Sequence, residues 1–219
     1  WHSSARVAKV RLGSLWQLLD ENGKALTEAK WTSININFYQ PELSEIEADG
    51  QWGLLDARSG NVILEPAFQK IWKPTKDENP TFVAIDANGV GSLFDSAGKK
   101  ICDLPGLHLE RVDKESKGWP LQYIDDLLCY PKESGWGAID TAGNEKLPFK
   151  YEFIGVRGQG GSIVDEGAIQ VTLGGKVGFT ALDGKMISET KWDTAGFFSE
   201  GVAYVSYGKR WAFIDKTGE

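Results

Sequence analysis

The sequence predicts an all-β protein, a tandem array of about five and a half three-stranded hairpin repeats of ~39 residues each. Three observations predict this class. One motif recurs along the whole chain, extended segments recur at fixed distances from it, and no 11-residue window keeps the 3.6-residue apolar period of a helix. Such an array can close into a propeller-like ring or stay an open β-solenoid, and the sequence leaves both architectures open.

The recurring motif sets the period. It is Trp52-Gly53-Leu54-Leu55-Asp56 followed by Gly60, with further copies whose lead positions are 16, 91, 136, 177 and 211. Successive lead positions are 36, 39, 45, 41 and 34 residues apart. We therefore predict one array over residues 1–219, with units at about 5–42, 43–81, 82–126, 127–167, 168–201 and 202–219.

Each repeat reads as three strands. The lead segment is rich in β-branched and aromatic residues and is bounded by turn residues, which is typical of a strand. An extended segment starts nine residues before most lead positions, at 7–10, 82–85, 168–171 and 202–205, with 127–130 a looser match. A return strand follows the turn at 24–26, 61–64, 99–101 and 185–187. A large residue recurs about 15 positions after the lead, as Trp31, Phe68, Tyr151 and Trp192.

The Asp and Gly residues of the motif are typical of a hairpin turn. Asp56 can accept a hydrogen bond from the backbone two residues on, and Gly60 accepts a positive φ, so residues 56–60 are predicted to form a hairpin turn. Gly53 weakens a strand and therefore indicates a bulge or a close approach. We expect a large side chain of a neighbouring repeat, such as its Trp, to lie over this glycine.

These motifs resemble the WG repeat (WG-containing repeat) family of bacterial proteins, whose units look like G-K-W-G-F-I-D-x-x-G-K-x-V-I and F-S-E-G-L-A-x-V. The best matches are at residues 197–205 (FFSEGVAYV) and 208–218 (GKRWAFIDKTG). Departures are Gly91 and Val177 for Trp, Gln17 and Ala212 for Gly, and Ala181 for Asp. The resemblance covers essentially the whole chain. It implies a β-rich bacterial repeat protein and no reaction. From the fold class we expect an interaction or binding module.

Charge excludes two classes of partner. The chain carries 24 Lys and Arg against 31 Asp and Glu, a formal net charge of −7. Binding to nucleic acid or to an anionic membrane face requires clustered cations, so we expect neither partner. No run of 18 apolar residues is present, so we expect no membrane insertion within this segment.

The search for catalytic and metal sites finds no complete constellation. The Gly-rich segment 158–161 lacks the Lys of a phosphate-binding loop, and His108 has only Glu110 as a near acid. Cys102 and Cys129 cannot make a zinc site alone, and they are either two thiols or one disulfide. We therefore predict no catalytic residues, no metal and no cofactor, with a hydrolase-type enzyme only a distant third hypothesis.

The tryptophans carry the binding hypothesis. Six of the nine are at repeat positions, where we expect core packing between units: Trp16, Trp31, Trp52, Trp136, Trp192 and Trp211. Trp72 and Trp119 adjoin polar, proline-containing loops, and with Tyr123 they are the candidate binding residues. We predict a non-catalytic module that binds another protein. The alternative is a carbohydrate-binding module, which requires at least two exposed aromatic faces in one plane.

Overall fold

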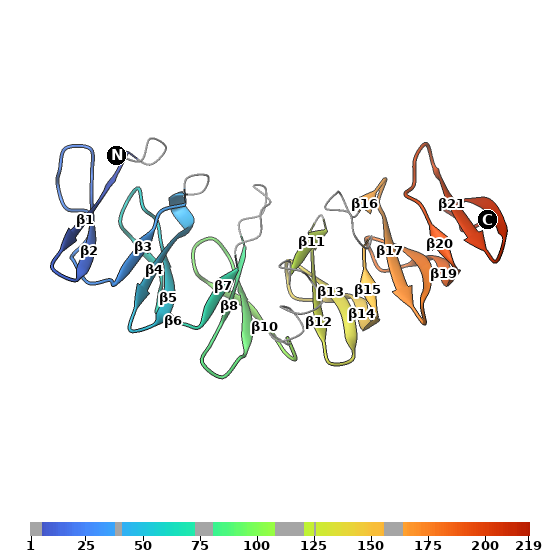
Figure 1. Cartoon of the computed structure of the whole chain (residues 1–219), viewed down its shortest axis with the longest axis horizontal. Helices are drawn as coiled ribbons and strands as arrows, with labels where there is room; N and C mark the ends of the chain where they lie inside the picture. The colour runs from blue at the N-terminus through green and yellow to red at the C-terminus, as the bar shows by residue number, and fades with distance from the viewer. Residues whose placement is uncertain (1–5, 38–40, 73–80, 108–120, 125, 156–163) are drawn as a thin grey trace. The chain divides into compact units, whose positions relative to one another are not determined.

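The computed structural model describes residues 6–37, 41–72, 81–107, 121–124, 126–155 and 164–219. Over these residues the chain forms six small antiparallel sheets, each built from strands close together in sequence, and one short 3₁₀ helix (Figure 1). None of the six sheets closes on itself. The predicted all-β repeat class is confirmed, and the choice between a ring and an open array stays a prediction.

The chain divides into two compact units, Trp1–Leu104 and Pro105–Glu219. The first unit contains sheets 1 to 3. Sheet 1 consists of β1 (Ala8–Leu12) and β2 (Leu15–Leu19). Sheet 2 consists of β3 (Ser33–Asn35), β4 (Ser44–Ala48), β5 (Gln51–Leu55) and β6 (Val62–Phe68), with the 3₁₀ helix η1 (Pro41–Leu43) before β4. Sheet 3 consists of β7 (Lys70–Trp72), β8 (Phe82–Ile85), β9 (Gly91–Phe94) and β10 (Lys100–Leu104).

The second unit contains sheets 4 to 6. Sheet 4 consists of β11 (Gln122–Ile124), β12 (Leu127–Lys132), β13 (Gly135–Asp140) and β14 (Glu145–Tyr151). Sheet 5 consists of β15 (Phe153–Ile154), β16 (Val164–Asp165), β17 (Ala168–Leu173), β18 (Lys176–Ala181) and β19 (Met186–Trp192). Sheet 6 consists of β20 (Thr194–Ala195), β21 (Val202–Tyr207) and β22 (Arg210–Asp215).

The sheets share one plan, the predicted three strands with a short edge strand added. In sheets 2 to 5 a hairpin is followed by a return strand, and the edge strand pairs with the first strand of the hairpin. Sheet 6 has no return strand within the described residues. The return strand predicted at 24–26 is wrong as a strand, because sheet 1 shows there only isolated pairings, Leu19 with Ala25 and Trp16 with Trp31.

The lead residue and the large residue about 15 positions later are cross-strand partners. Their pairing explains why the two positions recur together in the sequence, since opposite residues in antiparallel strands have neighbouring side chains. The pairs are Trp16 with Trp31, Trp52 with Phe68, Trp136 with Tyr151 and Val177 with Trp192.

The glycine after the lead residue lies in a bulge. The pairing register shifts on both sides of Leu54 in sheet 2, and a Cβ on Gly53 would lie within 3 Å of the backbone of Leu64, Glu65 and Pro66 in β6. In sheet 5 a Cβ on Gly178 would lie 2.7 Å from the carbonyl oxygen of Ser188. The expected cover by a neighbouring repeat's Trp is therefore wrong. The return strand of the same sheet bends over the glycine, as bulged strands do.

The predicted turn chemistry is confirmed. The Gly60 N–H donates to the Asp56 carbonyl oxygen at 2.7 Å, and the Arg58 N–H donates to Asp56 Oδ1 at 2.9 Å. Gly60 has a φ of 76°, in the left-handed region that glycine tolerates. In the turns that end at Gly23, Gly98, Gly143, Gly184 and Gly218, which are one residue shorter, the glycine N–H likewise donates to the carbonyl of the residue that opens the turn.

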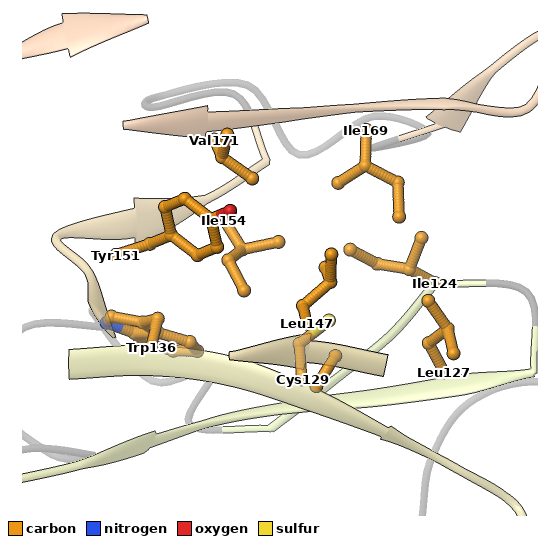
Figure 2. Close-up of a cluster of buried hydrophobic side chains, with 10 residues drawn as sticks. Ile124, Leu127, Cys129, Trp136, Leu147, Tyr151, Ile154, Ile169 and Val171 are labelled. Atoms are coloured by element: carbon orange, nitrogen blue, oxygen red, sulfur yellow. The ribbon is translucent and has the colours of Figure 1, made fainter. Parts of the chain in front are cut away.

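Hydrophobic clusters lie between consecutive sheets within each unit. Figure 2 shows the cluster between sheets 4 and 5, where Trp136, Leu147 and Cys129 of sheet 4 face Ile169 and Val171 of β17. We call such a contact a seam. Each seam joins two different faces. One sheet contributes its Trp face, which carries the lead residue and the second residue after it. The next sheet contributes its hairpin-strand face, which carries residues of its first hairpin strand such as Ile169 and Val171 of β17. Three further seams follow this plan, between sheets 1 and 2, 2 and 3, and 5 and 6.

Two backbone features hold the seams. One residue joins the return strand of a sheet to the edge strand of the next, for example Gln69 between β6 and β7 and Asp193 between β19 and β20. In addition, the turn glycine of one sheet packs on a carbonyl of the segment that follows the hairpin turn in the preceding sheet. Such contacts within 3 Å of a built Cβ are Gly60 on Leu26, Gly98 on Ile63, Gly184 on Lys146 and Gly218 on Ile187.

Candidate functional site

The Trp face of sheet 6 is exposed. Pairing of β21 with β22 sets Tyr204 opposite Phe213, and Trp211 is two positions away on the same side of β22. The exposed fractions are 40% for Val202, 46% for Tyr204, 67% for Trp211 and 71% for Phe213. We call these four residues the terminal aromatic face.

The same positions are buried in the sheets that have a following sheet. Phe213 is the second residue after the lead, and its counterparts Leu18, Leu54, Ala138 and Phe179 are 0 to 1% exposed. In these repeats the following sheet of the same unit covers the position. Among the described residues of this unit, no following sheet covers the terminal aromatic face.

Backbone contacts fix one of the rings. A Cβ on Gly196 would collide with the Tyr204 ring, so the ring lies directly against this backbone. The Gly196 N–H donates to the Tyr204 carbonyl oxygen at 2.9 Å. The Tyr204 and Trp211 rings have centroids 5.7 Å apart and are tilted by 47°. The Tyr204 side of the face is therefore held in one geometry by the backbone at Gly196.

The predicted core role of Trp211 is wrong. Trp31 and Trp136 are buried as expected, at 2% and 3% exposure, and Trp16, Trp52 and Trp192 are partly buried. Trp211 has the same motif position but no sheet stacked on its face. A motif match alone does not tell whether a face is covered.

Two of the three residues predicted to bind a partner lie in different units. Trp72 is partly buried on β7, where it pairs with Val83, and Lys70 Nζ lies 4.4 Å from its ring centroid. Tyr123 lies on β11 of the other unit, where its backbone pairs with Leu128. Trp119 lies outside the described residues, as do His108, Glu110 and the segment 158–161. Binding by Trp72, Trp119 and Tyr123 stays a prediction.

The carboxylates with shifted pKa values hold turns and links between strands. Burial alone would raise the pKa of Asp140, but hydrogen bonds from Asn144, Lys146 and the Ala142 N–H lower it to about 2. A hydrogen bond from Lys176 and one from the Gly208 N–H lower the pKa of Asp193. These groups stay ionised at neutral pH and serve as acceptors for nearby backbone and lysine donors.

The cysteines are not joined by a disulfide. Cys129 is fully buried in the seam of Figure 2, and burial raises the pKa of its thiol, so it packs as a small apolar side chain. Among the residues described by the structure, no three His, Cys, Asp or Glu side chains are grouped so that they could hold a metal ion.

A hollow of about 450 Å³ lies beside β19 in the second unit, lined in part by Met186, Ile187 and Thr217. An ion pair between Lys216 Nζ and Glu166 Oε2 at 3.1 Å lies at its wall. Both partners are already engaged, since Lys216 Nζ also donates to the Glu166 carbonyl oxygen and Glu166 Oε2 accepts from the Gly201 N–H. This hollow therefore offers a ligand little beyond apolar contact.

The terminal aromatic face is an exposed apolar surface on a fixed strand pair. Three aromatic rings and a valine project from a strand pair whose opposite face is fixed in the seam with sheet 5 by Ala203, Val205 and Ile214. A rigid apolar surface of this kind gains binding free energy from its burial and loses little conformational entropy.

In the described part of the chain, no helix is long and apolar enough to span a bilayer.

Comparison with known proteins finds one similar family. The family model described as WG containing repeat matches residues 136–158 and 182–211. Comparison with curated proteins finds no match.

Similar solved structures include the computationally designed protein Ika8, at 12% identity over 91% of this chain and 64% of that chain, with a TM-score of 0.39. A eukaryotic initiation factor is similar at 13% identity over 96% of this chain and 61% of that chain, with a TM-score of 0.44. The WD40 β-propeller domain of Doa1 is similar at 11% identity over 94% and 73%, with a TM-score of 0.32. The chain spans less than two thirds of the length of the first two of these structures.

The fold assignment therefore depends on the strand pairings above, and the repeat assignment on the motif. The first matched segment contains β13 and β14, and the second runs from the turn before β19 to the lead residue of β22. In sequence, residues 136–158 and 182–211 are similar to the family described as WG containing repeat.

Proposed function

We propose that this chain is a non-catalytic protein-binding scaffold and that its contact surface is the terminal aromatic face. The observation that carries the proposal is the exposure of Trp211 and Phe213, at 67% and 71%, beside Tyr204 and Val202. Clustered exposed apolar side chains on a folded surface are typical of interaction sites. Trp and Tyr are also the residues most enriched among those that contribute most to protein–protein affinity.

The ring geometry favours a protein over a sugar. A flat sugar ring stacks on aromatic faces that share a plane, whereas Tyr204 and Trp211 are tilted by 47°. Tilted rings suit the interdigitating side chains of an apolar protein surface, which fill the angle between them. Carbohydrate binding through exposed Trp is therefore the alternative outcome of the test below.

A photo-cross-linking experiment tests the proposal. p-Benzoylphenylalanine is placed at position 213 on the face or, as the control, at position 207. Tyr207 is 63% exposed in the same sheet, but strand alternation places it on the opposite side. After irradiation in host extract, we expect protein adducts from position 213 that are absent from position 207. Equal adducts from both positions, or none, contradict the proposal.

A glycan array probed with the wild type and with Trp211→Ala distinguishes the protein-binding scaffold from the carbohydrate-binding alternative. We expect no glycan signal that depends on Trp211. A glycan signal that is lost in Trp211→Ala, with no protein adduct at position 213, would replace the protein scaffold by the carbohydrate-binding module.

A further inference from the structure

We infer that two carboxylates clamp the hairpin β21–β22 of sheet 6 onto sheet 5, and that acid opens this clamp. The carboxylates belong to Asp193 and Glu166, and they hold opposite ends of the hairpin. Between these ends the seam consists of apolar side chains such as Phe179, Val205 and Ile214. The inference concerns how the seam between sheets 5 and 6 opens, so it does not depend on what the terminal aromatic face binds.

Asp193 holds the closed end of the hairpin. Asp193 is the one residue between β19 and β20, and its N–H donates to the Ser206 carbonyl oxygen at 2.8 Å. Its Oδ2 accepts from the Gly208 N–H at 2.5 Å, in the turn between β21 and β22. Its Oδ1 accepts from the Nζ of Lys176, the first residue of β18. One side chain thus joins the turn of sheet 6 to a strand of sheet 5.

Glu166 holds the open end of the hairpin. This residue lies in the turn between β16 and β17 of sheet 5. Its Oε2 accepts from the N–H of Gly201, just before β21, at 3.0 Å, and lies 3.1 Å from the Nζ of Lys216, just after β22. Lys216 Nζ also donates to the Glu166 carbonyl oxygen at 2.7 Å. The start and the end of the sheet 6 hairpin are therefore tied to one residue of sheet 5.

Each carboxylate combines an ion pair with a bond to the backbone. The side chains of Asp193 and Glu166 are 35% and 36% exposed, and an ion pair at such a surface contributes little by itself. Hydrogen bonds to a charged acceptor are about twice as strong as neutral ones, and each carboxylate here also satisfies a glycine N–H in a turn. The clamp therefore loses most of its strength when the carboxylates become neutral.

The groups that face Asp193 favour its ionised form. The hydrogen bond from Lys176 and that from the Gly208 N–H lower its pKa, although desolvation opposes them. The Tyr207 ring adjoins this pair, with its centroid 5.7 Å from Lys176 Nζ. Because folding lowers the pKa of Asp193, this end of the clamp is complete above the ordinary value of 3.8 and is lost as the pH falls below it.

Glu166 responds to pH in the same direction. The hydrogen bond from Lys216 and that from the Gly201 N–H lower its pKa from the ordinary value of 4.5, against desolvation. Lys185 lines the hollow beside this ion pair and adds a second cation there. This end of the clamp is likewise complete above pH 4.5 and is lost at lower pH, so both ends open in acid.

The first unit offers neutral counterparts of Asp193. Gln69 is the one residue between sheets 2 and 3, and its Nε2 donates to the Ala87 carbonyl oxygen at 2.9 Å, in the turn between β8 and β9. Between sheets 1 and 2, the Thr32 hydroxyl donates to the Glu47 carbonyl oxygen at 2.9 Å. An amide and a hydroxyl do not titrate in acid, so these links stay closed where that of Asp193 opens.

Hydrogen exchange of the full chain between pH 2.5 and 7, corrected for intrinsic exchange rates, tests the inference. We expect the protection of residues 202–215 to fall by about 10- to 100-fold as the pH drops from 5 to 2.5, relative to that of residues 82–94 in the first unit. Protection that falls equally in both segments of the wild type overturns the clamp. This pH series needs no variant.

Neutral variants of similar shape separate the clamp from general effects of acid. Asp193→Asn/Glu166→Gln should lose about the same protection of residues 202–215 already at pH 7, and acid should then add no further difference between the two segments. Asp183→Asn is the matched control, because the Asp183 carboxylate accepts from the Lys185 N–H within its own turn of sheet 5. Wild-type protection of residues 202–215 in the folded double variant, or an equal loss in Asp183→Asn, contradicts the clamp.

Discussion

The seam between sheets 4 and 5 and the open face of sheet 6 are built from the same repeat positions with opposite exposure. Trp136 is 3% exposed and Ala138 is fully buried, whereas Trp211 and Phe213 at the matching positions are 67% and 71% exposed (Figure 2 shows the buried seam). The residues around Trp136 come from two sheets, and those around Trp211 from one. In a stacked array, burial is thus a property of the neighbouring repeat as much as of the motif itself.

Truncating the two lead tryptophans gives the largest contrast. We expect Trp136→Ala to lower the free energy of unfolding by about 3–5 kcal/mol, because it opens a cavity in a packed seam. We expect Trp211→Ala to cost less than about 1 kcal/mol, because its ring is mainly exposed. Urea denaturation of both variants measures the difference. Similar losses for the two would show that the open face is covered within the isolated chain.

Exchanging glycine and alanine at the position after the lead sharpens the comparison. We expect Gly178→Ala to lower the free energy of unfolding by about 1–3 kcal/mol, because the new Cβ meets the Ser188 carbonyl of the bulged return strand. Ala212 in β22 has no return strand over it, so Ala212→Gly should cost only about 0.5–1 kcal/mol, the ordinary penalty of a strand glycine. Thermal and urea denaturation would contradict this account if Gly178→Ala proved neutral.

Acid denaturation gives the smallest contrast, between the turn carboxylates Asp140 and Asp215. The pKa of Asp140 is lowered from 3.8 to about 2 in the folded chain, so its contribution is present above about pH 4 and is lost as the pH falls toward 2. Asp140→Asn should therefore cost about 1–2 kcal/mol at pH 7 and almost nothing at pH 2.

Asp215 is the matched control for this pH dependence. Hydrogen bonds from the Thr217 hydroxyl and backbone lower its pKa, but no lysine is among the causes, whereas Lys146 Nζ lies 3.3 Å from Asp140 Oδ2. We expect a smaller and flatter loss for Asp215→Asn over the same pH range. Unfolding free energies of both variants are measured every half unit between pH 2 and 7. Identical pH profiles for the two variants would show that Lys146 does not contribute to the pH dependence at Asp140.

Much of the fold could be predicted because the motif is a local one. Strand, Asp turn and glycine follow from neighbouring residues, and Asp56 to Gly60 forms the hairpin turn expected from them. The edge strands could not be predicted, because segments such as Phe153–Ile154 and Thr194–Ala195 are too short to show a period and pair through their backbones. The bulge over Gly53 is likewise a matter of register between two strands, which the order of side chains does not specify.

The candidate site was only half predictable. Trp211 stands out in the sequence as a repeat residue, but the motif assigns it to the core, because every copy of the motif predicts the same burial. Its exposure depends on whether another sheet packs on β22, and that information lies outside the motif. Trp72 shows the reverse case, since its position off the motif suggested a loop and the structure places it on β7, partly buried beside Lys70.

The glycine-to-carbonyl contacts have a consequence for how such arrays tolerate insertions. In the four repeats that form seams, the lead residue, its partner and the carbonyl beneath the next turn glycine lie within the 17 residues that begin at the lead residue, and the edge strand follows after one more. Differences in the spacing of these repeats, from 34 to 41 residues, therefore fall between the edge strand and the next hairpin. Evolution or an engineer can graft foreign peptides there, for instance after Trp72, and leave every seam contact at its original spacing.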